Sequence, residues 1–391
     1  MCYNKATKIL CGGIEMSKFY VELKKVVDDS YDIEVGRNLF DTLVNDLKGE
    51  LGVGISKYAI ITDSNVKPLY GDKLYERLVR EGFKVDLISF PAGEKSKVRA
   101  TKEMIEDEML AKGHRRDSCI IALGGGVVTD LAGFVAGTFG RGIPFINYST
   151  SILGSADASV GGKTAVDTPL ATNLIGLIYQ PKKVYIDLAT WETLPKEQIS
   201  NGLAETIKHA CLADKVFFEY LEEHIQELLE PNGIHNHAEV CEHIAEKNCK
   251  IKYEVVKQDE RETNLRQILN LGHTIGRAIE TLSDYTLLHG EAVAIGLAMQ
   301  AQIGEKLGYV STEEVERVMK LIEKAGLPTK LSDDMPTDKV VQKLYTDKKV
   351  RSGKIRFVFQ EGIGSVKQFE DENYSIALEE DFIREIIDEI R

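Results

Sequence analysis

The amino-acid sequence predicts an α/β N-terminal domain with a parallel, Rossmann-like sheet, followed by a mostly α-helical C-terminal domain. Three observations carry this prediction. Short β-rich segments alternate with helical ones in the first half, a glycine-rich turn follows one strand, and the second half holds long helical patterns with few strand signals. A chain of 391 residues is long enough for two domains. We place them at residues 1–190 and 191–391.

Strands and helices of the first half are separated by short connections. The β-rich segments are residues 58–63, 84–90, 118–126, 144–150 and 183–188. The helical segments lie between residues 70 and 82, 97 and 113, and 129 and 138. Such alternation predicts a parallel sheet with helices on its faces, and ligands bind such sheets at the carboxyl ends of the strands.

The glycine turn lies in "CIIALGGGVVTDLAGFVAG", where a buried strand runs into the start of a helix. Glycines there let the phosphates of a ligand approach backbone N–H groups at a helix N-terminus. The spacing is not GxGxxG, so two interpretations stay open: a dinucleotide site and a tight turn without a ligand. The loops "TDSNV" and "PAGEKSK" also follow strands, and together the three loops favour a dinucleotide.

Candidate metal ligands lie on three helical segments of the second half. Glu205, His273 and His289 would leave a fourth position open, as catalytic zinc sites do. The alternative is that both histidines are hydrogen-bonded core residues, and the spacing does not decide between the two. A second histidine group, residues 235–237 with His243, lies in a polar, loop-like region, where we expect a solvated surface.

The candidate cations for ligand binding are Arg141, Lys163, Lys208, Lys252, Arg266, Arg277, Lys348 and Lys349. Several of them are embedded in apolar or glycine-rich sequence, which is unusual for solvent-facing side chains. Desolvated lysines and arginines need anionic partners. A substrate that bears phosphate and carboxylate groups would supply them.

Composition narrows the partners and the compartment. The net charge of −13 disfavours nucleic acid, and no apolar run is long enough for a transmembrane helix. The N-terminal segment lacks the features of a secretory signal, and the six cysteines show no CxxC pairing. We therefore expect a cytoplasmic protein with reduced thiols that acts on a small molecule without nucleic-acid or membrane partners.

Six long segments of the chain are distinctive: "ALGGGVVTDLAGFVAGTFGRGI", "TSILGSADASVGGKTAVDTPLATNLIGLIYQP", "ETLPKEQISNGLAETIK", "LNLGHTIGRAIE", "LHGEAVAIGL" and "DKKVRSGKIRFV". With these segments the chain resembles, from about residue 55 to 365, the 3-dehydroquinate synthase family of the sugar phosphate cyclases. The resemblance implies a dehydroquinate synthase-like fold, a bound NAD, one divalent metal (zinc or cobalt) and a homodimer. It also implies the conversion of 3-deoxy-D-arabino-heptulosonate 7-phosphate to 3-dehydroquinate and phosphate, a step of the shikimate pathway.

The resemblance also assigns residues. Glu205, His273 and His289 correspond to the metal ligands. The NAD contacts would be Asp63, Asn65, Glu94, Lys97, Gly125, Gly126, Val127, Asp130, Thr150, Ser151, Leu153, Thr193 and Leu194. The substrate and phosphate site would comprise Asp157, Lys163, Asn173, Lys208, Lys252, Arg266, Asn270, Arg277, Lys348 and Lys349, with Arg141 lent by the other subunit. In this scheme Lys163 and Asn173 hold the departing phosphate.

Three positions depart from the family pattern. Arg277 replaces a second histidine, Thr172 replaces a lysine, and Gln198 replaces a glutamate. Arginine keeps phosphate binding but does not exchange a proton near pH 7. The alternatives are therefore a cyclase of the 2-epi-5-epi-valiolone or 2-deoxy-scyllo-inosose synthase type, or a metal-dependent polyol or glycerol-phosphate dehydrogenase. Lys252, Arg266 and Asn270 favour the carboxylate-bearing heptulosonate.

Overall fold

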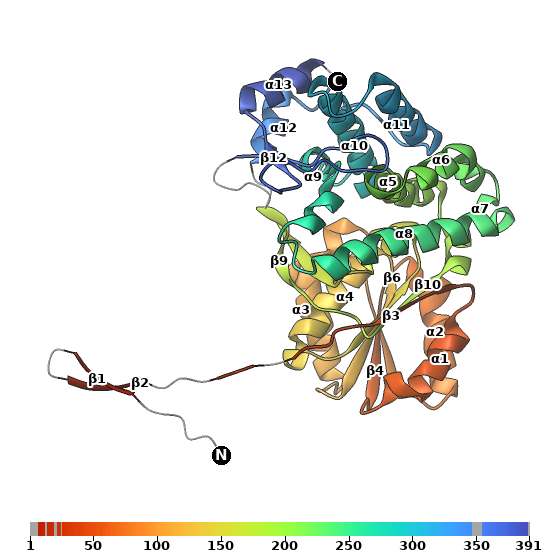
Figure 1. Cartoon of the computed structure of the whole chain (residues 1–391). Coiled ribbons are helices and arrows are strands. Elements are labelled where there is room, and N and C mark those ends of the chain that lie inside the picture. The colour runs from red at the N-terminus through yellow and green to blue at the C-terminus, as the bar shows by residue number, and fades with distance from the viewer. Residues whose placement is uncertain (1–6, 12–13, 19–21, 25, 346–353, 390–391) are drawn as a thin grey trace. The chain divides into compact units, whose positions relative to one another are not determined.

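A computed structural model describes the chain except for residues 1–6, 12–13, 19–21, 25, 346–353 and 390–391. The chain divides into two compact units, residues 1–30 and residues 31–391. The first unit contains an antiparallel hairpin of β1 (Thr7–Cys11) and β2 (Ile14–Lys18), which the sequence pattern does not predict. The second unit holds all the other elements shown in Figure 1.

A six-stranded sheet forms the centre of the α/β half, with the strand order β3-β10-β7-β6-β4-β5. Every neighbouring pair is parallel, so the predicted parallel sheet is confirmed. The strands are β3 (Asp32–Gly36), β4 (Lys57–Asp63), β5 (Val85–Phe90), β6 (Ser118–Gly124), β7 (Phe145–Ser149) and β10 (Lys183–Asp187). All five predicted strands are present. The sixth, β3, lies at the edge of the sheet, and its partly exposed, acidic sequence gives no clear strand signal.

Helices cover both faces of this sheet. They are α1 (Phe40–Lys48), α2 (Asp72–Arg80), α3 (Arg99–Ala111) and α4 (Gly126–Thr138). Alternate residues of β4 point to opposite faces: Tyr58 and Ile60 pack with α1 and α2, and Ala59 and Ile61 pack with α3 and α4. The helix α4 begins at Gly126 and not at residue 129 as predicted, because the last glycine of the turn already belongs to the helix.

A second hairpin, of β8 (Lys163–Thr168) and β9 (Ala171–Ile178), packs against α4. Two glycines of α4 make this approach possible. A Cβ atom on Gly133 would lie 2.5 Å from Thr164 Cγ2, and one on Gly137 would lie 2.6 Å from Leu177 Cδ1. The sequence pattern does not predict this hairpin, since β9 is largely exposed and lacks a buried apolar face.

The helical half follows η6 (Leu188–Thr193), where the predicted domain boundary falls; the boundary itself stays a prediction. Its main helices are α5 (Lys196–Ala213), α6 (Lys215–His224), α7 (Gly233–Asn236), α8 (Ala238–Gln258), α9 (His273–Leu282), α10 (His289–Lys306), α11 (Thr312–Lys324), α12 (Thr337–Leu344) and α13 (Glu380–Glu389). Two short strands, β11 (Arg356–Phe357) and β12 (Ile376–Ala377), pair with each other. The helices α5 and α10 are buried along most of their length.

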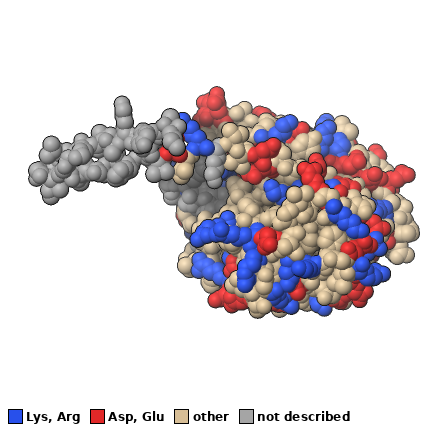
Figure 2. Space-filling model, turned by 90° about the horizontal axis from the view of Figure 1, so that it is seen from below, with Lys and Arg blue, Asp and Glu red and all other residues tan. Residues whose placement is uncertain are grey.

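Most of the second histidine group is helical, so the loop-like prediction was wrong for these residues, and only residue 237 lies in the turn between α7 and α8. Residues 235 and 236 end α7, and His243 lies within α8, where its ring packs against Tyr220. Within the described residues, no helix is long and apolar enough to cross a membrane. On the face seen in Figure 2, acidic and basic side chains are interspersed.

Candidate active site

Three side chains from three helices converge in the helical half. Glu205 lies on α5 and is fully buried, and its Oε1 lies 3.3 Å from His273 Nε2 and 3.4 Å from His289 Nε2. The two histidines are the first residues of α9 and α10. These helices pack closely because a Cβ atom on Gly276 would lie only 2.9 Å from Ala292 O. The structure therefore brings all three predicted metal ligands together.

The other ring nitrogen of each histidine, Nδ1, contacts an oxygen atom on the side of the ring away from Glu205. His273 Nδ1 donates to Leu271 O at 3.1 Å, and His289 Nδ1 lies 3.2 and 3.3 Å from the two carboxylate oxygens of Glu280. These contacts fix both rings with Nε2 toward Glu205. Outer contacts of this kind orient histidine ligands in metal sites.

The electrostatics of this cluster suit a cation. Burial alone would raise the pKa of Glu205, but the Lys208 ammonium and the two imidazoles hold it well below its ordinary value. Burial lowers the pKa of His273 to about 4, whereas Glu280 and Glu205 outweigh burial and raise the pKa of His289 to about 10. Glu205 Oε1 is buried and lacks a hydrogen-bond partner among the described residues. A carboxylate and two imidazole nitrogens around one point form a donor set that fits a divalent ion.

A second group of possible ligands, Asp157, Glu205 and His209, lies beside the first. The two carboxylates of this group already pair with ammonium groups. Lys208 Nζ donates to the second oxygen of Glu205, and Lys252 Nζ lies 2.6 Å from Asp157 Oδ1. The first group is thus the better candidate for a metal site. Lys208, predicted to touch substrate, is buried against Glu205 and is not among the residues that line the cavity described next.

A cavity of about 280 Å³ lies beside the cluster. Seven of the predicted substrate residues line it: Asp157, Lys163, Asn173, Lys252, Arg266, Asn270 and Arg277. The predicted metal ligand His273 and the predicted NAD contact Asp130 line it as well. One cavity therefore adjoins both predicted cofactor sites.

The deepest cation of this cavity is Arg266, which is 1% exposed. Its Nη2 donates to Gly161 O at 2.9 Å, and its backbone N–H donates to Asp259. Gly161 has a φ of +92°, and a Cβ atom there would lie 2.5 Å from Arg266 Nη2, so this position requires glycine. Burial lowers the pKa of Arg266, yet an arginine stays charged near neutral pH.

Glu262 is a cavity residue that the motifs do not single out. Its carboxylate lies 2.7 Å from Lys163 Nζ and also accepts from Asn270 Nδ2 at 2.7 Å. Its φ of +59° is unusual for a residue with a side chain. Asp259 holds this loop by accepting three backbone N–H groups, which lower its pKa to about 2 against the effect of burial. One signal for Glu262 was available in the sequence: it lies between the predicted substrate residues Lys252 and Arg266.

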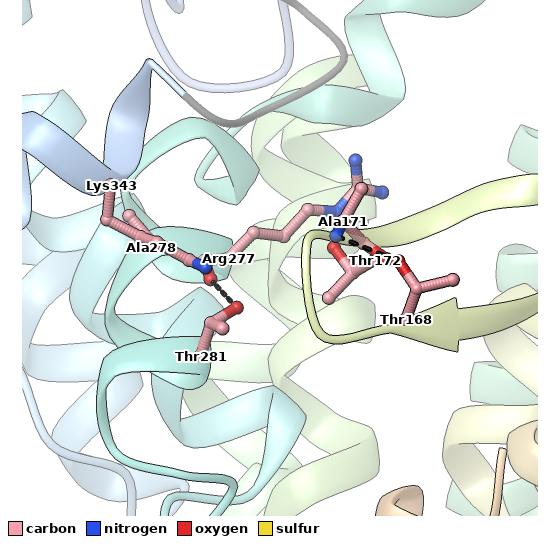
Figure 3. Close-up of a pocket in the computed structure, with 7 residues that line it drawn as sticks. All are labelled: Thr168, Ala171, Thr172, Arg277, Ala278, Thr281 and Lys343. Carbon is pink, nitrogen blue, oxygen red and sulfur yellow. Dashed lines mark hydrogen bonds between the residues drawn. The ribbon is translucent and has the colours of Figure 1, made fainter. Parts of the chain in front are cut away.

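Arg277 extends from α9 toward the tip of the β8–β9 hairpin (Figure 3). It lines the main cavity and also a smaller one of about 20 Å³ beside Thr168, Thr172 and Lys343. Its Nε is buried and has no hydrogen-bond partner among the described residues. Two of the departures from the family pattern, Arg277 and Thr172, thus lie at the same place.

The predicted NAD contacts follow the carboxyl ends of strands of one sheet. Asp63 ends β4 and Asn65 follows it, and the others lie after β5, β6, β7 and β10. The helix α4 has Gly125 at its N-cap and no side-chain cap, so its first N–H groups are available to an anion. A Cβ atom on Gly125 would lie 2.9 Å from Ser151 Oγ, which places the loops after β6 and β7 in contact. After β10, the hydroxyl of the predicted NAD contact Thr193 forms a hydrogen bond of 2.8 Å with the Tyr70 hydroxyl.

For two further groups of predicted substrate residues, Arg141 and the pair of Lys348 and Lys349, the structure shows no place in this cavity. Arg141 is exposed, has a φ of +72° and does not line the cavity of its own chain. Lys348 and Lys349 lie outside the described residues.

Comparison with known proteins places the chain in a family. The family model for the 3-dehydroquinate synthase N-terminal region matches residues 87–201, and the model for the C-terminal region matches residues 202–350. The chain is 44% identical to 3-dehydroquinate synthase of Thermoanaerobacter sp. (strain X514) over 339 residues, which are 86% of this chain and 93% of that one. The chain belongs to the 3-dehydroquinate synthase family. A family member from Caldanaerobacter subterraneus subsp. tengcongensis is also 44% identical, over 90% of this chain and 96% of its own.

Solved structures agree with this family and confirm the predicted fold class. The 2-epi-5-epi-valiolone synthase of Streptomyces hygroscopicus subsp. jinggangensis, with NAD+ and Zn2+ bound, superposes with a TM-score of 0.82 at 27% identity, over 94% of this chain and 98% of that one. A 2-deoxy-scyllo-inosose synthase complexed with carbaglucose-6-phosphate, NAD+ and Co2+ has a TM-score of 0.81 at 23% identity, over 92% of this chain and 96% of that one. The latter likeness concerns the fold alone.

Proposed function

We propose that this chain is a 3-dehydroquinate synthase, which converts 3-deoxy-D-arabino-heptulosonate 7-phosphate to 3-dehydroquinate and phosphate with NAD and one divalent metal. The observation that carries the proposal is the cavity of about 280 Å³, which meets the metal cluster at His273 and the cofactor edge at Asp130. Lys163, Lys252 and Arg266 line it, so it suits a substrate with more than one anionic group.

The cofactors divide between the two halves of the chain. Glu205, His273 and His289 would hold the metal, and the loops after β4 to β7 and β10 would hold NAD, with its pyrophosphate at the start of α4. When bound, the metal supplies a Lewis acid for a substrate oxygen and NAD supplies a reversible hydride acceptor. This division supports the proposed domains, residues 1–190 and 191–391.

The chain's own residues would orient the substrate and control its protons. Lys252 and Arg266 provide positive charge for the carboxylate. Lys163 and Asn173 provide donors for the phosphate, which carries away the negative charge of the elimination. Glu262, 2.7 Å from Lys163 Nζ, keeps that ammonium in place and can accept a proton at its carboxylate.

The proposal is tested by supplying purified protein, loaded with NAD and zinc, with three sugar phosphates in turn. We expect phosphate release from the heptulosonate phosphate and much slower release from sedoheptulose 7-phosphate and glucose 6-phosphate, because these two lack the carboxylate. Preferential turnover of either of the latter two would assign the chain to another branch of the sugar phosphate cyclases.

Exchange of Arg277 for histidine is expected to keep kcat/KM within about tenfold, or about 1.4 kcal/mol, if the guanidinium serves to bind phosphate. Histidine would restore the family pattern at a position that lines the cavity. The measurement is steady-state kinetics with the heptulosonate phosphate. A far larger loss would assign Arg277 a function that histidine lacks.

A homodimer is part of the proposal, as is a cytoplasmic location. Two observations support the dimer. The β8–β9 sheet has two strands, and β9 and the turn before it expose Leu170, Leu174, Ile175 and Ile178, of which Leu170 is 83% exposed. Arg141 lies near the end of this strand, since a Cβ atom on the adjacent Gly142 would lie 3.2 Å from the Tyr179 hydroxyl. An apolar edge beside an exposed arginine suits an interface that delivers the arginine to a neighbouring site.

Subunit mixing tests the role of Arg141. We expect Arg141→Ala and His273→Ala each to abolish turnover. After denaturation and joint refolding in equal amounts, they are expected to recover about a quarter of the wild-type activity, because half of the dimers are mixed and each mixed dimer holds one complete site. Refolded wild type is the control for recovery. Absence of complementation would show that Arg141 does not act across subunits.

A further inference from the structure

Asp167, near the end of β8, contacts residues of two predicted sites: Asn173 of the phosphate site and Lys97 of the NAD site. No motif assigns Asp167 a role. It is 6% exposed, and the β8–β9 register shifts between Val166 and Thr168, at this residue. Its backbone N–H donates to Lys97 O at 2.7 Å. Its two carboxylate oxygens have different partners: Oδ1 accepts from Asn173 N at 2.7 Å, and Oδ2 lies 3.9 Å from Lys97 Nζ.

Asn173 has an unusual backbone that this contact stabilises. Its φ of +54° lies in the left-handed region, which residues with a Cβ atom seldom adopt. Its side chain lines the main cavity, and its Oδ1 is buried with no hydrogen-bond partner among the described residues. Thr168 closes the hairpin tip through two bonds to Ala171, each of 3.1 Å (Figure 3). The tip is therefore built to present the Asn173 amide to the cavity.

Lys97 links this hairpin to the cofactor edge of the sheet. It is 4% exposed and pairs with Glu94, Asp130 and Asp167. Asp130 lines the same cavity as Asn173. One buried ammonium among three carboxylates fixes three segments relative to one another: the loop after β5, the first turns of α4 and the end of β8.

We propose that Asp167 is a positioning residue, whose carboxylate sets the Asn173 amide for the phosphate group while it anchors the hairpin to Lys97. The inference rests on the proposed function, since it takes the cavity as the phosphate site. Asp167 acts through Asn173 and does not touch the substrate. Its removal is therefore expected to add little to the loss of phosphate affinity once the Asn173 amide is gone.

A double-mutant cycle tests this inference with inorganic phosphate as the probe. The full chain, loaded with NAD and zinc, is titrated with phosphate in a calorimeter. We expect Asp167→Ala and Asn173→Ala each to weaken phosphate binding about tenfold, and the double variant to bind no more than about twofold weaker than either single variant. Asp167→Asn keeps an oxygen that accepts from Asn173 N–H, so it is expected to restore most of the affinity.

The outcomes separate a positioning role from a merely structural one. Additive losses in the double variant, wild-type affinity in Asp167→Ala or no phosphate binding by the wild type would each overturn the inference. Because the readout is binding without turnover, a failure of the proposed function would be recognised separately, as a wild type that binds phosphate but does not convert the heptulosonate phosphate.

Discussion

Replacement of His273 by alanine is expected to abolish turnover and to reduce bound metal from about one ion per chain to near zero. Glu205 Oε1 lies 3.3 Å from this imidazole and 3.4 Å from that of His289, so the change would leave two ligands where catalytic sites have three. Metal content, measured by elemental analysis after dialysis, checks the first half of the expectation. Phosphate release from the heptulosonate phosphate checks the second.

Glu280→Gln is the matched comparison for this variant. Glu280 contacts the far nitrogen of His289 and not the metal position, so we expect metal affinity to fall by about tenfold to a hundredfold, with activity regained at high metal concentration. Wild-type metal content in His273→Ala would contradict the assignment of the three ligands.

Lys252→Met is expected to affect both stability and activity. Lys252 is 4% exposed and pairs with Asp157 at 2.6 Å. Loss of one partner of a buried pair costs about 3–5 kcal/mol. Because 35% of the Asp157 side chain remains exposed, we expect a smaller loss in the free energy of unfolding, about 2 kcal/mol. We expect kcat/KM to fall by about a hundredfold or more, equivalent to about 2.7 kcal/mol, because the substrate carboxylate loses a cation.

The double variant Asp157→Asn/Lys252→Met separates the two effects. It leaves no unpaired charge, so urea unfolding is expected to return close to the wild-type midpoint while turnover stays low. If turnover recovered together with stability, the role of Lys252 in substrate binding would be wrong and its role would be structural.

Much of the sheet could be predicted because its central strands are continuous apolar segments. The residues of β6 are all buried, and the glycines after it mark the turn into α4. The edge strand β3 and the hairpin of β8 and β9 were missed, since partly exposed strands carry mixed polar and apolar sequence. Packing against α4, which stabilises this hairpin, is a long-range contact that no local pattern contains.

The residues of the candidate site also divide into those that the sequence predicted and those that it missed. Glu205, His273 and His289 were named from motifs, and the structure brings them together. Glu262 and Asp167 were not, because an acidic residue has the same local sequence whether its side chain faces solvent or a lysine inside the protein. Only the folded chain shows which carboxylates meet lysines.

The central claim is that the chain catalyses a cyclisation without net oxidation, and the balance of phosphate against NADH tests it most directly. With a small amount of NAD and an excess of the heptulosonate phosphate, we predict many phosphates released for each NAD present and no net NADH absorbance. The accumulation of NADH in proportion to the substrate consumed, without phosphate release, would contradict the claim and would identify a dehydrogenase.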